Sequence, residues 1–196
     1  MTPHAAERDN AFTGLEAAIV LIAFVIVAAA FSYVVLGAGF FTTQKAQETV
    51  HTSVQQASST LEIVGNVYGS GTDSSAITTL NFTVALAPGG TPVDFSKVVL
   101  TYSNSTVLVT LNQTEGSYPI TVAPGVGHWA VVGVNNDVGT SNKLLEAGEQ
   151  FQIAAMPPNS IYPNDKFTLE VKPAVGAAFD ITRTAPGGLN KVNLLY

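Results

Sequence analysis

The sequence of 196 residues contains no cysteine and little charge. Without cysteine, neither a disulfide framework nor a thiolate metal site can form, so stability must come from packing and assembly. Charged residues make up 11% of the chain, against about 25% in typical soluble domains. Lys and Arg together number eight and the net charge is −6, so there is no basic patch for a phosphate backbone. These absences argue against nucleic acid as a partner.

In place of charge the chain has apolar residues, which reach 46% of the total and dominate residues 17–41, a run in which Tyr33 is the only ionisable residue. This run exceeds the roughly 20 residues that a helix needs to cross a bilayer, so we expect it to enter a membrane. The polar residues before it lack the Lys/Arg-rich start of a secretory signal. The run is also too long for the apolar part of such a signal. A conventional signal peptide is therefore the weaker interpretation.

Glu16 lies at the edge of the apolar run, where a carboxylate is costly unless a cation neutralises it. If a peptidase cut between Ala11 and Phe12, the new α-amine would lie four residues before Glu16, one helical turn away. It could also meet the Glu16 of a neighbouring subunit. The alternative is an uncut anchor whose Glu16 sits at the membrane interface, and the residues alone leave both open.

Two parts of the chain carry a family resemblance. Phe12-Thr13-Gly14-Leu15-Glu16 and the apolar run resemble the N-terminus of archaeal flagellins (archaellins), which are members of the type IV pilin-like superfamily. The passage over residues 39–46 is closer to archaellins than to archaeal adhesive pilins. Residues 148–151, 167–173 and 179–184 resemble the closing strands of archaellins.

The resemblance implies how the N-terminus is processed. In that superfamily a prepilin-type peptidase removes a short polar leader on the cytoplasmic side, and a Glu is common at the fifth mature position. By this resemblance residues 1–11 are a cleaved leader, the cut falls between Ala11 and Phe12, and Glu16 is the charge partner of the mature N-terminus. The leader departs from the family at residues 8–11, where Arg-Asp-Asn-Ala replaces the usual basic-Gly pair, so the cut could differ by one residue.

After Lys45 the chain becomes amphipathic without a helix breaker. Its apolar residues follow a spacing of three or four, which predicts that the helix continues; they are Ala46, Val50, Val54, Ala57, Leu61 and Val64. One helix over residues 12–64 would be about 80 Å long, so its second half must pack on its own domain, on neighbouring helices or on both. Gly65 is predicted to end the helix, and Gly69 and Gly71 mark a flexible linker over residues 65–76.

From Ile77 the apolar period changes to two, which predicts a half-buried strand, as Leu80, Phe82, Val84 and Leu86 alternate with other residues. Further strands are predicted at 97–102, 106–111, 129–134, 149–154, 167–172, 179–184 and 189–196. Short strands punctuated by Gly, Pro and Asn indicate an all-β sandwich or barrel over residues 77–196. The resemblance makes this domain immunoglobulin-like. The predicted fold class is α+β, a long N-terminal helix followed by an all-β outer domain.

Three N-x-S/T sequons, at Asn81, Asn104 and Asn112, are candidate N-glycosylation sites. Asn81 is on the polar phase of its strand, and the other two flank the following strand in predicted turns. Family members commonly carry N-glycans, which would provide the solubility that the few charged side chains do not.

No catalytic or metal-binding arrangement emerges from the residues. The histidines His4, His51 and His128 lie in the leader, the helix and a loop, without ligand spacing. Residues 135–137 (Asn-Asn-Asp) lack the twelve-residue calcium pattern and are more simply a turn. Gly37-Ala38-Gly39 sits inside the apolar helix, where small residues allow close helix approach, and is not a phosphate loop. We therefore expect no enzyme activity, cofactor or metal.

The resemblance implies a structural subunit of the archaeal flagellum (archaellum), an extracellular filament for swimming. The subunit would insert into the cytoplasmic membrane, then polymerise through its helix with itself or with sister archaellins, and a separate membrane motor and platform would turn the filament. The alternatives are an adhesive type IV-like pilin subunit and a membrane-anchored cell-surface binding module. Electron microscopy separates the last, which makes no filaments, and motility loss on deletion separates the first two.

Overall fold

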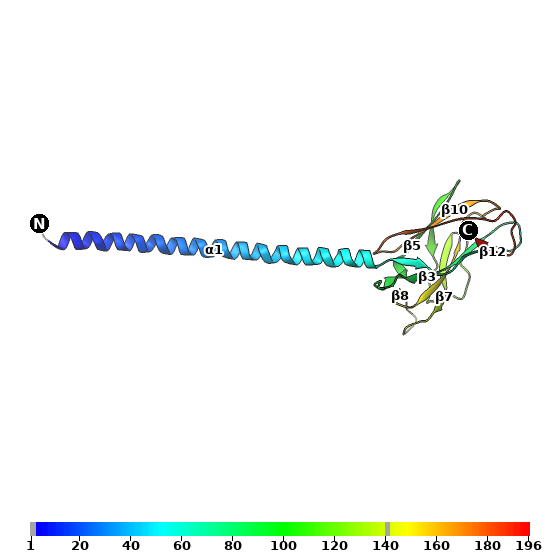
Figure 1. The fold of residues 1–196 in the computed structure, drawn as a ribbon, viewed down its shortest axis with the longest axis horizontal. Coiled ribbons are helices and arrows are strands. Elements are labelled where there is room, and N and C mark those ends of the chain that lie inside the picture. Colours follow the sequence, from blue (N-terminus) through cyan, green and yellow to red (C-terminus); the bar gives the residue numbers. More distant parts are fainter. Residues whose placement is uncertain (1–2, 140–141) are drawn as a thin grey trace. The chain divides into compact units, whose positions relative to one another are not determined.

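The computed structural model describes residues 3–139 and 142–196, with the side chains of residues 3–13, 57 and 58 left out. The chain divides into two compact units, Met1–His51 and Thr52–Tyr196. In the described residues the first unit is helical, and the second carries the strands (Figure 1).

The helix α1 spans Pro3–Ser58, and its 56 residues correspond to a length of about 84 Å. Pro3 is at the first helical position, where its missing N–H costs nothing, and no proline follows within the helix. The last turn closes where the Ser59 N–H donates to the Gln55 carbonyl oxygen at 2.9 Å.

The prediction that this helix continues to Val64 is wrong. Residues Leu61–Ile63 form a strand, β1, which pairs antiparallel with β3 (Thr79–Leu86), Leu61 opposite Leu86. Leu61 fits the helical stripe, but it also alternates with Ile63 about Glu62, and this second pattern prevails because it buries Leu61 to 3% exposure. Residues 61–63 fit both a helical and a strand periodicity, and the pairing with β3, which is distant in the chain, selects the strand.

The predicted flexible linker over residues 65–76 is also wrong, because it contains a strand, β2 (Val67–Ser70), between β12 (Val192–Leu195) and β3. The glycines here serve close packing. A Cβ added at Gly71 would lie 2.1 Å from the Ala76 carbonyl oxygen, closer than real atoms approach. Val67 is 2% exposed in the core, so the β-domain begins at Leu61 rather than at residue 77.

The eight predicted strands are confirmed as β3 and seven others. These are β5 (Val99–Asn104), β6 (Leu108–Gln113), β7 (His128–Asn135), β9 (Gln150–Met156), β10 (Lys166–Lys172), β11 (Phe179–Thr184) and β12. A small pair, β4 (Val93–Asp94) with β8 (Leu144–Leu145), and the 3-10 helix η1 (Phe95–Lys97) were not predicted, since two or three residues are too few to show a period.

The main sheet runs in the order β11-β10-β5-β6-β7-β9-β3-β2-β12, with β1 beside β3. Its neighbours pair antiparallel except β6 and β7, which are parallel. The two ends of the sheet meet where the Thr184 N–H donates to the Tyr196 carbonyl oxygen at 2.8 Å. The sheet is thus a nearly closed sandwich or barrel, and the predicted fold class is confirmed.

The core of the β-domain is built around aromatic rings. Phe95 meets Phe151 and Trp129 edge to face, with ring centroids 5.0 and 6.5 Å apart, and Tyr118 meets Phe151 at 5.7 Å. All four are at most 3% exposed. Such edge-to-face pairs add stability to that gained from apolar burial, so this domain completes a core within one chain.

Candidate assembly surface and modification sites

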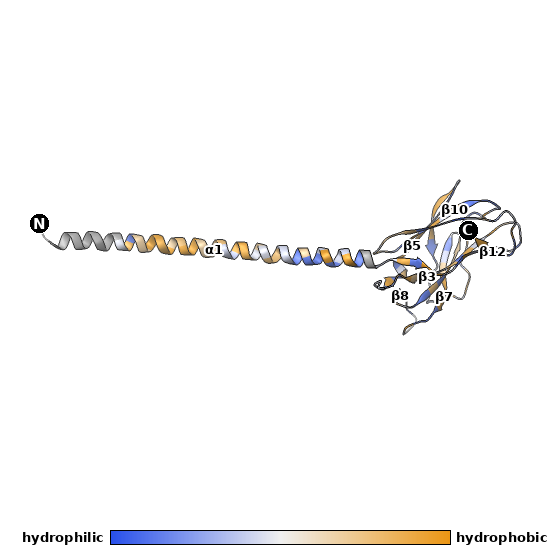
Figure 2. Cartoon of the chain, in the orientation of Figure 1, coloured by the Kyte–Doolittle hydropathy of each residue, from blue (hydrophilic) through white to orange (hydrophobic). Residues whose placement is uncertain are grey.

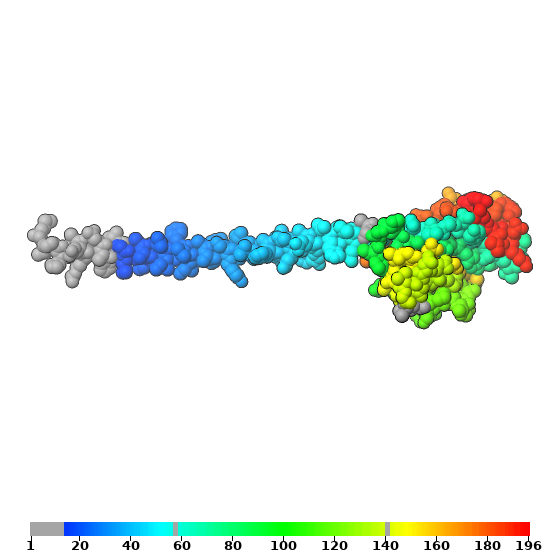
Figure 3. Space-filling model, turned by 60° about the horizontal axis from the view of Figure 1, so that its bottom comes forward, coloured from blue at the N-terminus to red at the C-terminus, as the bar shows by residue number. Residues whose placement is uncertain are grey.

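The apolar half of α1 presents its large side chains to the surface of the single chain. From Leu15 to Phe41 these side chains are between 52% and 82% exposed. Figure 2 shows this part of the helix mostly in orange, which gives way to blue toward the C-terminal end of α1, and Figure 3 draws the same stretch as spheres. In the described residues, Gly14–Gln56 is one helical stretch long and apolar enough to cross a membrane. So large an apolar surface is unfavourable in water and marks a contact surface for lipid or protein.

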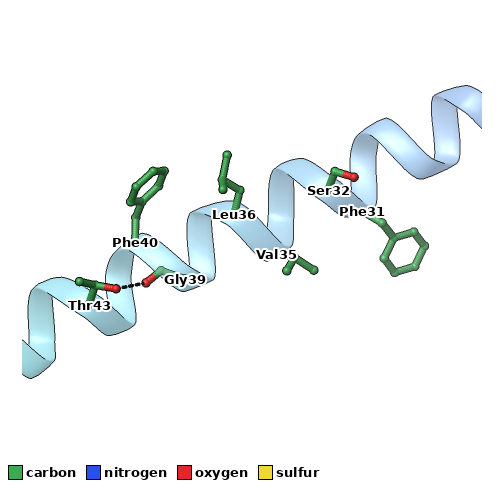
Figure 4. Close-up of a pocket in the computed structure, with 7 residues that line it drawn as sticks. All are labelled: Phe31, Ser32, Val35, Leu36, Gly39, Phe40 and Thr43. Carbon is green, nitrogen blue, oxygen red and sulfur yellow. Dashed lines mark hydrogen bonds between the residues drawn. The ribbon is translucent and has the colours of Figure 1, made fainter.

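A hollow lies on this surface around Gly39 (Figure 4), lined by Phe31, Ser32, Val35, Leu36, Gly39, Phe40 and Thr43. Gly39 leaves it open, because nothing lies within 4 Å of the position where a Cβ would be. The Thr43 hydroxyl donates to the Gly39 carbonyl oxygen at 2.9 Å, and the Thr42 hydroxyl donates to the Ala38 carbonyl oxygen at 2.8 Å. These hydroxyls are satisfied within the helix, so the surface can be dehydrated without leaving them unpaired.

The polar half of α1 keeps a narrow apolar stripe on its surface. Val50 and Val54 are 63% and 60% exposed. Lys45 and Glu48 form an exposed ion pair with 2.6 Å between Nζ and Oε2.

The predicted processing residues lie at the beginning of α1. Ala11 and Phe12 belong to the helix, but their side chains, like that of His4, lie outside the described residues. Glu16 is exposed on the helix surface. Cleavage between Ala11 and Phe12, and the pairing of Glu16 with the resulting amine, remain predictions.

Among the three sequons, Asn104 lies at the end of β5 in a turn whose next two residues are exposed. Its Oδ1 accepts hydrogen bonds from the Thr106 N–H at 2.9 Å, the Thr106 hydroxyl at 3.0 Å and the Val107 N–H at 2.8 Å. Its Nδ2 donates to the Tyr102 hydroxyl at 3.3 Å. One Nδ2 hydrogen can therefore be replaced while every one of these bonds is kept.

The threonines of the other two sequons are half-buried in the folded domain, whereas Thr106 is exposed. Asn81 is half-buried in the middle of β3, between β2 and β9, and its Nδ2 donates to the Ser70 hydroxyl at 3.1 Å. Asn112 is exposed on β6, but the hydroxyl of Thr114, the third residue of its sequon, is buried. At Asn104 the threonine of the sequon is exposed, and its hydroxyl lies beside the amide oxygen.

A buried carboxylate was missed from the sequence. Glu149 is 2% exposed, and its two oxygens accept the N–H groups of Val138 at 2.7 Å and Glu146 at 3.0 Å. Asn136 has a φ of 55° and its Nδ2 donates to the Gly148 carbonyl oxygen at 3.4 Å, so residues 135–137 bend toward the same place. Glu149 ties these loops together. The only indication of this carboxylate in the sequence is the Gly148-Glu149 pair just before a strand.

Two ionisable side chains of the β-domain, Tyr118 and Asp94, have pKa values that are shifted by their surroundings in the fold. Burial raises the pKa of Tyr118 to about 12, with a further contribution from the Asp94 carboxylate and opposed by a hydrogen bond from Gln113. A hydrogen bond from the Ser96 hydroxyl, with help from Lys97, holds the pKa of Asp94 below its usual value. Across the described residues, no group of three or more His, Cys, Asp or Glu could hold a metal ion.

A long helix with an exposed apolar half, followed by a β-domain with its own closed core, defines a filament subunit of the type IV pilin-like kind. The chain belongs to the archaeal-type flagellin family, whose sequence profile matches residues 11–183. As a member of that family it is a structural subunit of the archaeal flagellar filament, an extracellular surface structure used in motility.

Individual relatives agree with this assignment. The chain is 42% identical over 198 residues to "Probable flagellin 1" of Archaeoglobus fulgidus, covering 96% of each chain. It matches the structure of the archaeal flagellum of Methanospirillum hungatei strain JF1 with a TM-score of 0.69 and 34% identity, over 93% of this chain and 99% of that one. The crystal structure of flagellin FlaB1 from Methanocaldococcus jannaschii, at 18% identity and a TM-score of 0.57, shares the fold over 69% of this chain and 95% of its own.

Proposed function

We propose that the chain enters the cytoplasmic membrane through α1, loses its leader, and then packs that helix against copies of itself or sister flagellins in the core of the filament. The observation that carries this proposal is the exposure of the large apolar side chains between Leu15 and Phe41, at least 52% each. A surface of this kind needs lipid before assembly and protein after it.

Exchange between these two surroundings is physically reasonable because lipid tails and packed helices are similarly apolar. Helices associate in lipid through close packing rather than through the hydrophobic effect. The open hollow at Gly39 accepts an apolar side chain of a neighbouring helix, and the internally bonded hydroxyls of Thr42 and Thr43 add no desolvation cost. The β-domains would then form the outer wall.

Removal of residues 1–11 by a prepilin-type peptidase would place an α-amine one helical turn before Glu16. The pair would neutralise a carboxylate that otherwise borders an apolar surface. A mass spectrum of subunits from purified filaments tests this directly. We expect a mature chain that begins at Phe12, and a chain that retains residues 1–11 would refute the cleavage.

N-glycosylation of the β-domain belongs to the same proposal, with Asn104 as the first site. Support comes from its exposed turn and from the Nδ2 hydrogen that its hydrogen bonds leave available. Glycopeptide mass spectrometry of native filaments should find Asn104 modified more fully than Asn81 and Asn112. Unmodified asparagine at all three positions would refute it.

In this role the subunit is a passive propeller without enzyme activity, turned by a separate membrane motor and platform. The sequence carries no phosphate-binding loop that would let it hydrolyse a nucleotide itself. Deletion of its gene should abolish both swimming and the filaments seen by electron microscopy. Normal swimming with attachment lost would instead favour an adhesive pilin.

A further inference from the structure

A polar hollow lies directly beside Asn104 at the surface of the β-domain. Asn104 and Thr106 line it together with residues of a segment distant in the chain, namely Pro158, Asn159, Tyr162 and Asp165. Its volume of about 450 Å³ falls within the roughly 300–1,000 Å³ typical of ligand sites. The hollow therefore adjoins both the asparagine and the threonine of this sequon.

We propose that this hollow seats the first sugar of an N-glycan on Asn104, and that the sugar is a neutral pyranose. This inference rests on the proposed glycosylation of Asn104. Attachment forms a bond between the sugar C1 and Nδ2, breaks the bond from C1 to the phosphate leaving group of an activated donor, and releases one Nδ2 proton. The remaining Nδ2 hydrogen continues to donate to the Tyr102 hydroxyl.

The hydrogen bond from Nδ2 of Asn104 to the Tyr102 hydroxyl fixes the position from which the sugar extends. Tyr102 is fully buried and its ring stacks on Phe167 at 6.1 Å, so its hydroxyl is held by the core. Three hydrogen bonds hold Oδ1 of Asn104 in the turn. With both ends of the amide fixed, the C1 atom starts from a defined position on the rim of the hollow.

The lining residues between 158 and 165 have groups that can contact a sugar. The Tyr162 side chain lines the hollow and is 59% exposed, and an aromatic ring can pack against the apolar face of a pyranose. A tight turn holds it, because the Tyr162 N–H donates to Asp165 Oδ2 at 2.9 Å and the Asp165 N–H donates to the Tyr162 carbonyl oxygen at 3.1 Å. The amide of Asn159 and the carboxylate of Asp165 are acceptors for sugar hydroxyls.

The charge of the hollow selects the class of sugar. Among the described residues that line it, Asp165 alone is charged, and it is negative. A uronic acid as the first sugar would bring a second carboxylate next to this one, which is unfavourable. A neutral sugar avoids that repulsion, and acidic sugars can only follow further along the chain.

The test uses native filaments of the full mature chain. Glycopeptide mass spectrometry first establishes whether Asn104 is modified and whether its first sugar is neutral. A helical reconstruction should then show the first sugar continuous with Asn104 and lying against Tyr162 and Pro158. A modified Asn104 whose first sugar projects into solvent, or whose first sugar is acidic, overturns the seat and leaves the glycosylation standing. An unmodified Asn104 overturns both.

A double-mutant cycle measures the contact itself. The temperature at which filaments lose their β-sheet signal is compared with and without Asn104→Gln in three backgrounds, namely Tyr162, Tyr162→Phe and Tyr162→Ala. We expect Asn104→Gln to lower this temperature in every background, because it also breaks the hydrogen bonds of the turn, and to lower it by several degrees more where a ring is present than with Tyr162→Ala. Equal effects in all three backgrounds overturn the seat. If Tyr162→Ala filaments do not assemble, the reconstruction decides.

Discussion

The two units of this flagellin differ in how far they expose the same type of apolar residue. In α1, Phe24 and Phe31 are 73% and 69% exposed, whereas in the β-domain Phe95 and Phe151 are 0% and 1% exposed. Burial of such a side chain is favourable by about 1.5–3 kcal/mol. The β-domain obtains this within one chain, and α1 can obtain it only from lipid or from other subunits. Disruptive substitutions in α1 should therefore prevent assembly, whereas those in the β-domain should impair folding.

The largest effect should come from a charge in the apolar half of α1. We expect Gly37→Glu or Ala29→Glu to abolish filaments, because an unpaired buried charge costs several kcal/mol and the cost recurs in every subunit. Gln47→Glu, which puts the same charge on the polar half, is the control and should assemble. Electron microscopy reports filaments, and circular dichroism of the detergent-solubilised chain should show an intact β-domain. If Gly37→Glu filaments form normally, contacts between β-domains rather than between helices hold the polymer together.

The next effect separates the two units by truncation. A fragment that begins at Ser59 keeps β1 and β2 and should be soluble, monomeric and cooperatively folded. A fragment that begins at Gly69 lacks Leu61 and Val67, which are 3% and 2% exposed, and losing a large core side chain costs about 2–5 kcal/mol. Denaturant unfolding of both fragments measures this difference. Equal stabilities would show that these two strands add little to the domain.

A smaller effect is expected where the chain enters the β-domain. Gly176 has a φ of 115°, and a Cβ there would lie 1.8 Å from the Ser59 carbonyl oxygen. Gly176→Ala should therefore destabilise the Ser59 fragment by about 1–3 kcal/mol. Gly188→Ala is the matched control, since nothing lies within 4 Å of its added Cβ. If the two variants unfold at the same denaturant concentration, the contact with Ser59 is not a constraint.

The smallest effect is a pH dependence of the β-domain. The pKa of Tyr118 is raised to about 12 in the folded chain, from about 10 in an unfolded one. Its contribution to stability is complete below pH 10 and is lost as the pH rises from about 10 to about 12, at no more than about 1.4 kcal/mol per pH unit. Tyr118→Phe should flatten the unfolding profile in this window. An unchanged alkaline profile would assign the dependence to other groups, such as Tyr102, whose pKa is also raised by burial.

The candidate sites were partly predictable. The sequons are local triplets, so Asn81, Asn104 and Asn112 were evident from the sequence. Their ranking was not, because it depends on the buried Thr114 hydroxyl and on the hollow formed by residues 158–165, far from Asn104 in the chain. The loop connection made by Glu149 was missed because the N–H groups that it binds, those of Val138 and Glu146, are brought to it by turns that no periodicity predicts.

Local periodicity determined the class of each unit, because a run of 25 apolar residues and an alternation of period two are properties of neighbours in the chain. The end of the helix, the pairing of Leu61–Ile63 with β3 and the tight packing of Gly71 required the folded domain. In each of these places the residues were compatible with two local structures. The choice between them was made by pairings with segments distant in the chain, whose energy no local pattern contains.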